Sequence, residues 1–150
     1  SVLEEVVQAA MINTMSQDLG LAKKLGVKNM RFIASELIFK KGHNKVDIVG
    51  FDGVDLYFFE LKKGRISNLG QVENYMINYR KPDNNAILTQ LLKNYPINPV
   101  KKFKSIKGVM AMKYAENFEL GSHGKKLKND YGIKILFYDY SLLTKKLLWK

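Results

Sequence analysis

The chain of 150 residues contains no cysteine. This absence excludes disulfide frameworks, thiolate zinc sites and cysteine nucleophiles, and it favours a reducing cytoplasm as the compartment. No apolar run approaches the ~18 to 20 residues needed to cross a bilayer, and the first residues, Ser-Val-Leu-Glu-Glu, lack the basic and apolar regions of a signal peptide. We therefore expect a cytoplasmic protein with no membrane partner, while the start at Ser1 leaves room for residues upstream.

Residues that carry other common chemistries are also scarce. The sequence has only two histidines, each beside a glycine in a polar segment, so a histidine-based metal site is not credible. Its glycines have neither Walker nor Rossmann spacing, and no serine lies in a Gly-x-Ser-x-Gly element. P-loop nucleotide hydrolysis is therefore excluded, and no serine nucleophile is indicated.

Arginine is the third scarce type, because 22 of the 25 basic side chains are lysine. The formal net charge of +11 is uneven: residues 1–60 carry 7 basic and 8 acidic side chains, whereas residues 61–150 carry 18 and 6. A positive field attracts polyanions, most commonly nucleic acid, and lysine contacts phosphate as a point charge. Either backbone contact with nucleic acid or a lysine-rich surface inherited from an AT-biased genome explains this charge.

The sequence does contain enough apolar material for one core, with 46% hydrophobic and 26% charged residues. No repeat or linker divides the chain, so we expect a single domain over residues 1–150. Apolar residues at helical spacing predict a helix from Val2 to about Leu25. Three apolar runs separated by turn residues, Asp52-Gly53 among them, predict a three-stranded antiparallel meander over residues 35–62, starting with a strand over 35–39.

The second half of the chain predicts further helices and strands. The expected elements are a helix from Ser67 to about Tyr79, a second helix over 87–94, strands over 106–114 and 133–140, and a C-terminal helix over 141–148. This order indicates an α/β protein with a central mixed sheet and helices on both faces.

Three polar side chains interrupt the apolar runs of the meander, namely Asp47, Glu60 and Lys62. Residues two apart on a strand share a face, so Glu60 and Lys62 point the same way, and the hairpin folds Asp47 back towards them. Two carboxylates and the Leu61 carbonyl are hard oxygen ligands that suit Mg²⁺ or Mn²⁺, and a neighbouring lysine is suited to position the attacking water. The constellation predicts phosphodiester hydrolysis; an ordinary ion pair beside a solvent-facing Asp47 is the alternative.

This pattern resembles the PD-(D/E)XK nuclease superfamily, which has a restriction-endonuclease-like three-layer α/β/α fold. Asp47 matches the first motif acid, and Glu60-Leu61-Lys62 matches the (D/E)XK element. Val46 stands where the motif has proline, which weakens the match without removing a ligand. The resemblance covers about residues 33–80 and implies hydrolysis that leaves 5′-phosphate ends.

The segment after this motif is similar to the RecB-like and NucS-like branches of the superfamily. That similarity implies that Gln71 approaches the metal or the scissile phosphate and that Tyr75 lies one turn further along the same helix face. Many members supply a further acid from the first helix. The candidates are Glu4 and Glu5, and also Glu36, which is slightly preferred because a carboxylate within an apolar strand needs a partner or a metal.

We therefore predict a Mg²⁺- or Mn²⁺-dependent deoxyribonuclease in which Asp47, Glu60 and the Leu61 carbonyl hold the metal, Lys62 orients the water and Gln71 assists. The residues expected to contact DNA are Lys63, Arg65, Tyr75, Lys101, Lys102, Lys104, Lys125 and Lys126. The alternative is a catalytically inactive nucleic-acid-binding or assembly module with the same fold. The sequence leaves open whether the chain acts as a homodimer or in a larger complex.

Overall fold

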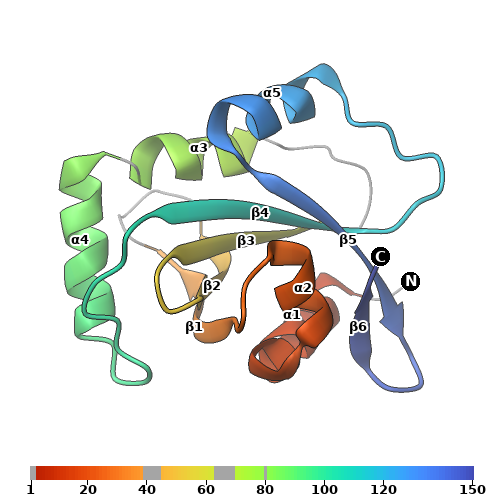
Figure 1. The fold of residues 1–150 in the computed structure, drawn as a ribbon, viewed down its shortest axis with the longest axis horizontal. Coiled ribbons are helices and arrows are strands. Elements are labelled where there is room, and N and C mark those ends of the chain that lie inside the picture. Colours follow the sequence, from red (N-terminus) through yellow and green to blue (C-terminus); the bar gives the residue numbers. More distant parts are fainter. Residues whose placement is uncertain (1–2, 39–44, 63–69, 80) are drawn as a thin grey trace.

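A single six-stranded sheet forms the centre of the protein, in a computed structural model that describes residues 3–38, 45–62, 70–79 and 81–150 (Figure 1). The strands lie side by side in chain order. They are β1 (Arg31–Leu37), β2 (Val46–Phe51), β3 (Leu56–Lys62), β4 (Ile106–Lys113), β5 (Lys134–Ser141) and β6 (Lys146–Trp149).

The sheet is mixed, as the sequence predicted. The pairs β1–β2 and β2–β3 are antiparallel and form the expected meander. The pairs β3–β4 and β4–β5 are parallel, and β6 returns antiparallel to β5. The carboxyl end of β3 therefore lies beside the carboxyl ends of β4 and β5.

Helices cover both faces of the sheet (Figure 1). One face carries α1 (Glu4–Thr14), the 3₁₀ turn η1 (Met15–Gln17) and α2 (Leu19–Leu25), which share a core with residues of β3, β4 and β5 such as Phe59 and Tyr138. The other face carries α3 (Gly70–Tyr79), α4 (Pro82–Lys93) and α5 (Ser122–Tyr131). The expected α/β class, with three α/β/α layers, is confirmed. None of the helices in the described ranges is long and apolar enough to cross a membrane.

The predicted first helix and first strand differ from the structure in their boundaries. The helix expected over 2–25 is interrupted at η1, and α2 begins anew because the Asp18 carboxylate accepts the Leu21 N–H at 2.9 Å. Strand β1 covers Arg31–Leu37, so it begins four residues before the predicted strand over 35–39 and ends before Ile38; residue 39 lies outside the described residues. Helix α4 begins at Pro82, a residue favoured in a first helical turn, five residues before the predicted start.

The largest error is the C-terminal helix, which is wrong: residues 141–148 complete β5, form a turn and run into β6. Lys145, with φ 56°, lies in the turn, and Leu147 is buried in the core next to α1. Short apolar runs suit a helix or a strand, so periodicity alone does not separate the two. Helix α5 was not predicted, because only Gly124 and Leu127 of its residues are buried.

Candidate active site

The candidate site lies where strands β2 and β3 stop pairing. Their ladder runs from Phe51↔Leu56 to Ile48↔Phe59, and one further step in this register places Asp47 opposite Glu60. At that step the Leu61 N–H donates to Asp47 Oδ2 at 2.8 Å. The Asp47 side chain therefore replaces a main-chain acceptor, and the structure brings this carboxylate to Glu60 as the sequence predicted.

Glu60 and Lys62 project from the same face of β3. Lys62 Nζ lies 3.3 Å from Glu60 Oε1, and the side chains are 19% and 4% exposed, respectively. Glu60 Oε2 is buried and has no hydrogen-bond partner in the described structure. A buried carboxylate oxygen without a donor is costly, so an ionised Glu60 would need a further donor or a cation at Oε2.

Burial and neighbouring negative charge disfavour the ionisation of both carboxyl groups. Burial raises the pKa of Glu60 to about 8, the adjacent Asp47 adds to the rise, and Lys62 offsets only part of it. Burial also raises the pKa of Asp47, against the hydrogen bond from Leu61. Ionising both groups at neutral pH therefore costs free energy, which a further cation beside them would lower.

The backbone after Glu60 adds main-chain oxygens to the site. The N–H and C=O of one strand residue point to the same edge, so the Leu61 carbonyl is directed to the edge of β3 where Asp47 lies. The next carbonyl, of Lys62, accepts a hydrogen bond from the Tyr138 hydroxyl at 3.1 Å. Tyr138 is 1% exposed in the core and thereby fixes the end of β3.

A third acid is less closely placed than the sequence suggested. Glu36 is 49% exposed, which corrects the expectation of a buried carboxylate; its backbone has φ 53°, and its side chain meets Lys45 at 3.8 Å. The charges of Glu4 and Glu36 both raise the pKa of Asp47, so both carboxylates act on the site from nearby. Glu5 is exposed on α1. Within the described ranges, no three His, Cys, Asp or Glu side chains form a group able to hold a metal.

Gln8 of α1 and Tyr138 of β5 are two contributors that the sequence did not indicate. Gln8 Nε2 donates to Glu36 Oε1 at 3.0 Å and to the Asp47 carbonyl at 2.9 Å, which ties α1 to β1 and β2. Tyr138 holds the Lys62 carbonyl from across the sheet. Their separations in sequence from the motif leave no local signal that would have identified them.

The remaining predicted residues fall into three groups. Lys63, Arg65 and the side chains of Gln71 and Tyr75 lie outside the described part of the structure. Lys101, Lys102 and Lys104 are exposed, but the Lys104 N–H bonds the Val54 carbonyl, so this loop lies at the Leu56 end of β3. Six strand residues at ~3.3 Å each separate that end from Lys62 by ~20 Å.

Lys125 and Lys126 are exposed on α5, the third group. The first turns of this helix are joined to α3 by the contact of His123 Nε2 with Glu73 Oε2 at 2.7 Å. Because α5 and α3 pack on the Glu60 face of the sheet, these two lysines are on the same side of the molecule as the carboxylates.

Comparison with known proteins adds a likeness at the level of the whole chain. No protein-family model matches the sequence, and no curated protein matches it. Among solved structures, the chain is similar to an XisH family protein from Nostoc punctiforme PCC 73102, with 17% identity, a TM-score of 0.43, and coverage of 99% of this chain and 98% of that one.

Proposed function

We propose that this chain is a metal-dependent nuclease that hydrolyses DNA phosphodiester bonds at the Asp47–Glu60–Lys62 site. The observation that carries the proposal is the pair of adjacent carboxyl groups at the end of the β2–β3 ladder, of which Glu60 is buried and has one oxygen without a partner in the described structure. A purely structural ion pair between Glu60 and Lys62 would not need Asp47 beside it, because that second carboxylate raises the cost of ionising the first.

The donors of the site suit a hard divalent cation. Asp47, Glu60 and the Leu61 carbonyl would hold Mg²⁺ or Mn²⁺, and the cation would be a partner for Glu60 Oε2, which has none in the described structure. When bound, such an ion polarises a phosphoryl oxygen and lowers the pKa of a coordinated water. Its charge would also offset the burial and the carboxylate repulsion that raise the pKa of both groups.

Lys62 supplies a positive charge at the same place. Its ammonium lies 3.3 Å from Glu60 Oε1, and the hydrogen bond from Tyr138 to its carbonyl fixes the backbone beneath it. We assign Lys62 to orienting the attacking water and to offsetting negative charge as the P–O3′ bond breaks. The ion pair with Glu60 holds this ammonium beside the carboxylates, and the Lys62 side chain is only 19% exposed.

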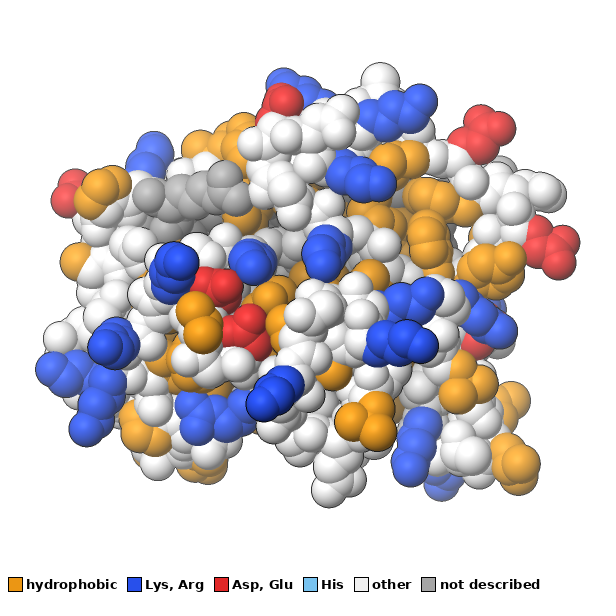
Figure 2. All heavy atoms as spheres, viewed as in Figure 1, with side chains coloured by type: hydrophobic (Ala, Val, Ile, Leu, Met, Phe, Trp, Pro, Cys, Tyr) orange, Lys and Arg blue, Asp and Glu red, His pale blue; other side chains and the backbone are white. Residues whose placement is uncertain are grey.

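The surface charge supports a polyanionic substrate. Figure 2 shows lysine and arginine side chains spread over one face of the protein, with fewer acidic groups among them. Lys125 and Lys126 of α5 are the predicted DNA contacts on the same side of the sheet as Glu60. Lys101, Lys102 and Lys104 would reach only DNA that extends along the whole sheet.

The proposal is tested by incubating the protein with single-stranded, branched and duplex DNA in Mg²⁺ or Mn²⁺. We expect cleavage products with 5′-phosphate ends, and a loss of at least ~100-fold in rate for Glu60→Gln and for Lys62→Ala. Asp139→Asn is the matched control, because Asp139 is a partly exposed carboxylate paired with Lys150 on β5. No cleavage by the wild type, or equal cleavage by all variants, would refute the nuclease assignment.

A non-catalytic nucleic-acid-binding module is the second candidate. The observation that favours it is the lack, among described residues, of a cluster of three metal-binding side chains. Mn²⁺ titration followed by electron paramagnetic resonance separates the two, because only a metal site of the proposed kind gives a bound Mn²⁺ signal that Asp47→Ala abolishes.

A further inference from the structure

A cavity lies beside β4 towards the amino ends of the parallel strands β3, β4 and β5, whereas the carboxylates lie towards the carboxyl end of β3. It has a volume of about 500 Å³, and residues from β3, β4, β5, α4 and α5 line it. On β4 its wall runs from Ile106 to Val109, and the described residues that line it do not include Asp47, Glu60 or Lys62. The cavity is therefore separate from the candidate active site.

The cavity exists because β5 begins later than β4. The first paired residues of these strands are Val109 and Lys134, so Ile106, Lys107 and Gly108 extend past the start of β5. The Ser105 carbonyl accepts the Leu56 N–H and the Ser105 N–H donates to Asp55, so the backbone of Ser105 faces β3. Backbone groups alternate along a strand, so the N–H and C=O of Ile106 point to the edge that β5 does not reach.

Two lysines give this cavity a positive wall. Lys107 and Lys134 both line it, and in the described part of the chain no lining side chain is acidic. Lys107 Nζ lies 3.2 Å from Asp55 Oδ2, and Lys134 Nζ donates to the Leu25 carbonyl at 3.1 Å. An ammonium has three N–H donors, so each lysine is held in place by one contact and retains further donors for a ligand.

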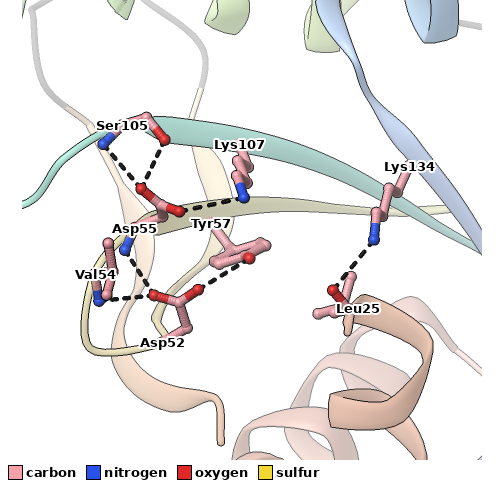
Figure 3. Close-up of polar contacts among 8 residues, drawn as sticks. All are labelled: Leu25, Asp52, Val54, Asp55, Tyr57, Ser105, Lys107 and Lys134. Carbon is pink, nitrogen blue, oxygen red and sulfur yellow. Dashed lines mark hydrogen bonds and ion pairs between the residues drawn. The ribbon is translucent and has the colours of Figure 1, made fainter. Parts of the chain in front are cut away.

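Asp55, the carboxylate that pairs with Lys107, is itself held by hydrogen bonds (Figure 3). Asp55 Oδ1 accepts hydrogen bonds from the Ser105 hydroxyl at 2.7 Å and from the Ser105 N–H at 3.1 Å. Burial alone would raise the pKa of Asp55, but the hydrogen bonds from Ser105 and Lys107 hold that pKa below its ordinary value. Asp55 is therefore ionised at neutral pH and keeps Lys107 positioned before any ligand arrives.

The far wall of the cavity carries an unfilled acceptor. Asn85 of α4 lines the cavity, and its Oδ1 is buried without a hydrogen-bond partner in the described structure. Lys107 lies over the Tyr57 ring at 5.8 Å and Lys134 reaches α2, so both cations face the α1–α2 side, whereas Asn85 comes from the opposite helical layer. The cavity thus extends along the part of β4 that β5 does not pair with, with Lys107 and Lys134 towards the α1–α2 side and Asn85 Oδ1 on the opposite side.

We propose that this cavity binds a phosphorylated small molecule of nucleoside monophosphate size, with its phosphate on Lys107 and Lys134 and an N–H group of its base, ring or exocyclic, donating to Asn85 Oδ1. Every common nucleobase has such a donor, and ligand cavities of ~300 to 1,000 Å³ are typical for molecules of this size. The Tyr131 side chain from α5 and the Ile106 backbone complete the walls beside the ligand. This inference does not depend on nuclease activity.

Isothermal titration calorimetry with AMP, GMP, CMP and UMP, in buffer free of divalent cations, tests the proposal. We expect saturable 1:1 binding of at least one nucleotide, with shifts of the Gly108 and Gly132 amide signals in NMR spectra. Adenosine or the matching nucleoside, and inorganic phosphate, are the two partial probes, and each should bind at least ~10-fold more weakly. Equal binding of either partial probe, or no binding of any nucleotide, overturns the proposal.

Variants locate the binding. Lys134→Met and Asn85→Leu should each weaken it by ~10-fold or more, and Lys107→Met should do the same even though it also frees Asp55. Lys113→Met is the matched control, because Lys113 is an exposed lysine at the other end of β4. Glu60→Gln should bind the nucleotide like the wild type. Unchanged affinity in both Lys134→Met and Asn85→Leu, with the fold intact by circular dichroism, overturns the assignment.

Discussion

The Leu61 N–H donates to Asp47 Oδ2 at 2.8 Å, so a side chain of β2 satisfies the backbone of β3 at the point where the two strands part. This contact holds Asp47 next to Glu60 at a position beyond the last residue pair of the β2–β3 ladder. The local geometry of one hairpin thereby sets the spacing of the two carboxyl groups.

Replacing Asp47 by Asn separates the role of its charge from the role of its hydrogen bond. The amide oxygen of Asn can still accept from Leu61, so the free energy of unfolding should change by less than about 1 kcal/mol. The neighbouring negative charge is lost, so the pKa of Glu60 should fall from about 8. A ¹³C NMR titration of the Glu60 carboxyl carbon measures this change; an unchanged pKa contradicts the coupling.

Replacing Glu60 by Gln should change how stability depends on pH. The pKa of Glu60 is about 8 in the folded protein against an ordinary value of 4.5, so its contribution to folding is complete below about pH 4.5 and is lost as the pH rises towards 8. Asp47, whose pKa is also raised, acts with the same sign.

Without divalent cations, the wild type should therefore lose stability between pH 5 and pH 8, and Glu60→Gln should lose at least ~2 kcal/mol less over that interval. Urea unfolding at four or five pH values gives the comparison, with Asp139→Asn as the control carboxylate. Parallel curves for wild type and Glu60→Gln would contradict the raised pKa. Adding Mn²⁺ at pH 8 should restore stability to the wild type alone.

Replacing Tyr138 by Phe removes the donor to the Lys62 carbonyl and keeps the buried ring. The unpaired carbonyl should cost ~1 to 3 kcal/mol of unfolding free energy. If Tyr138 positions Lys62, kcat for DNA cleavage should fall while KM stays within about twofold, because the residue does not reach the substrate. Tyr140→Phe on the same strand is the control, and equal effects of the two changes on kcat would argue against a positioning role.

Replacing Glu36 by Gly relieves a backbone conformation that side chains disfavour, since φ is 53° there. The change should stabilise the protein by ~1 kcal/mol, an amount that loss of the Gln8 hydrogen bond partly offsets. Glu36→Gln keeps the backbone conformation and removes only the charge. If Glu36 supplies a third metal ligand, both variants weaken Mn²⁺ binding; retained Mn²⁺ affinity in both assigns the site to Asp47 and Glu60 alone.

The sequence by itself determined the meander and the three residues of the site. The Asp52-Gly53 turn and the alternation of side chains along β2 and β3 are local properties, so they predicted that Asp47 folds back to Glu60 and that Lys62 shares its face. The mixed sheet followed from the order of helical and strand patterns along the chain.

Only the tertiary structure decided which elements the weaker patterns form and how the site is supported. Residues 146–149 become β6 because Leu147 is buried against α1 and the Trp149 indole donates to Asp18 Oδ2 at 2.7 Å, a contact across 131 positions of sequence. Gln8 and Tyr138 reach the site from α1 and β5 through contacts that no spacing rule contains. The raised pKa of Glu60 likewise arises from burial by distant segments, a quantity set by packing and not by neighbours in the chain.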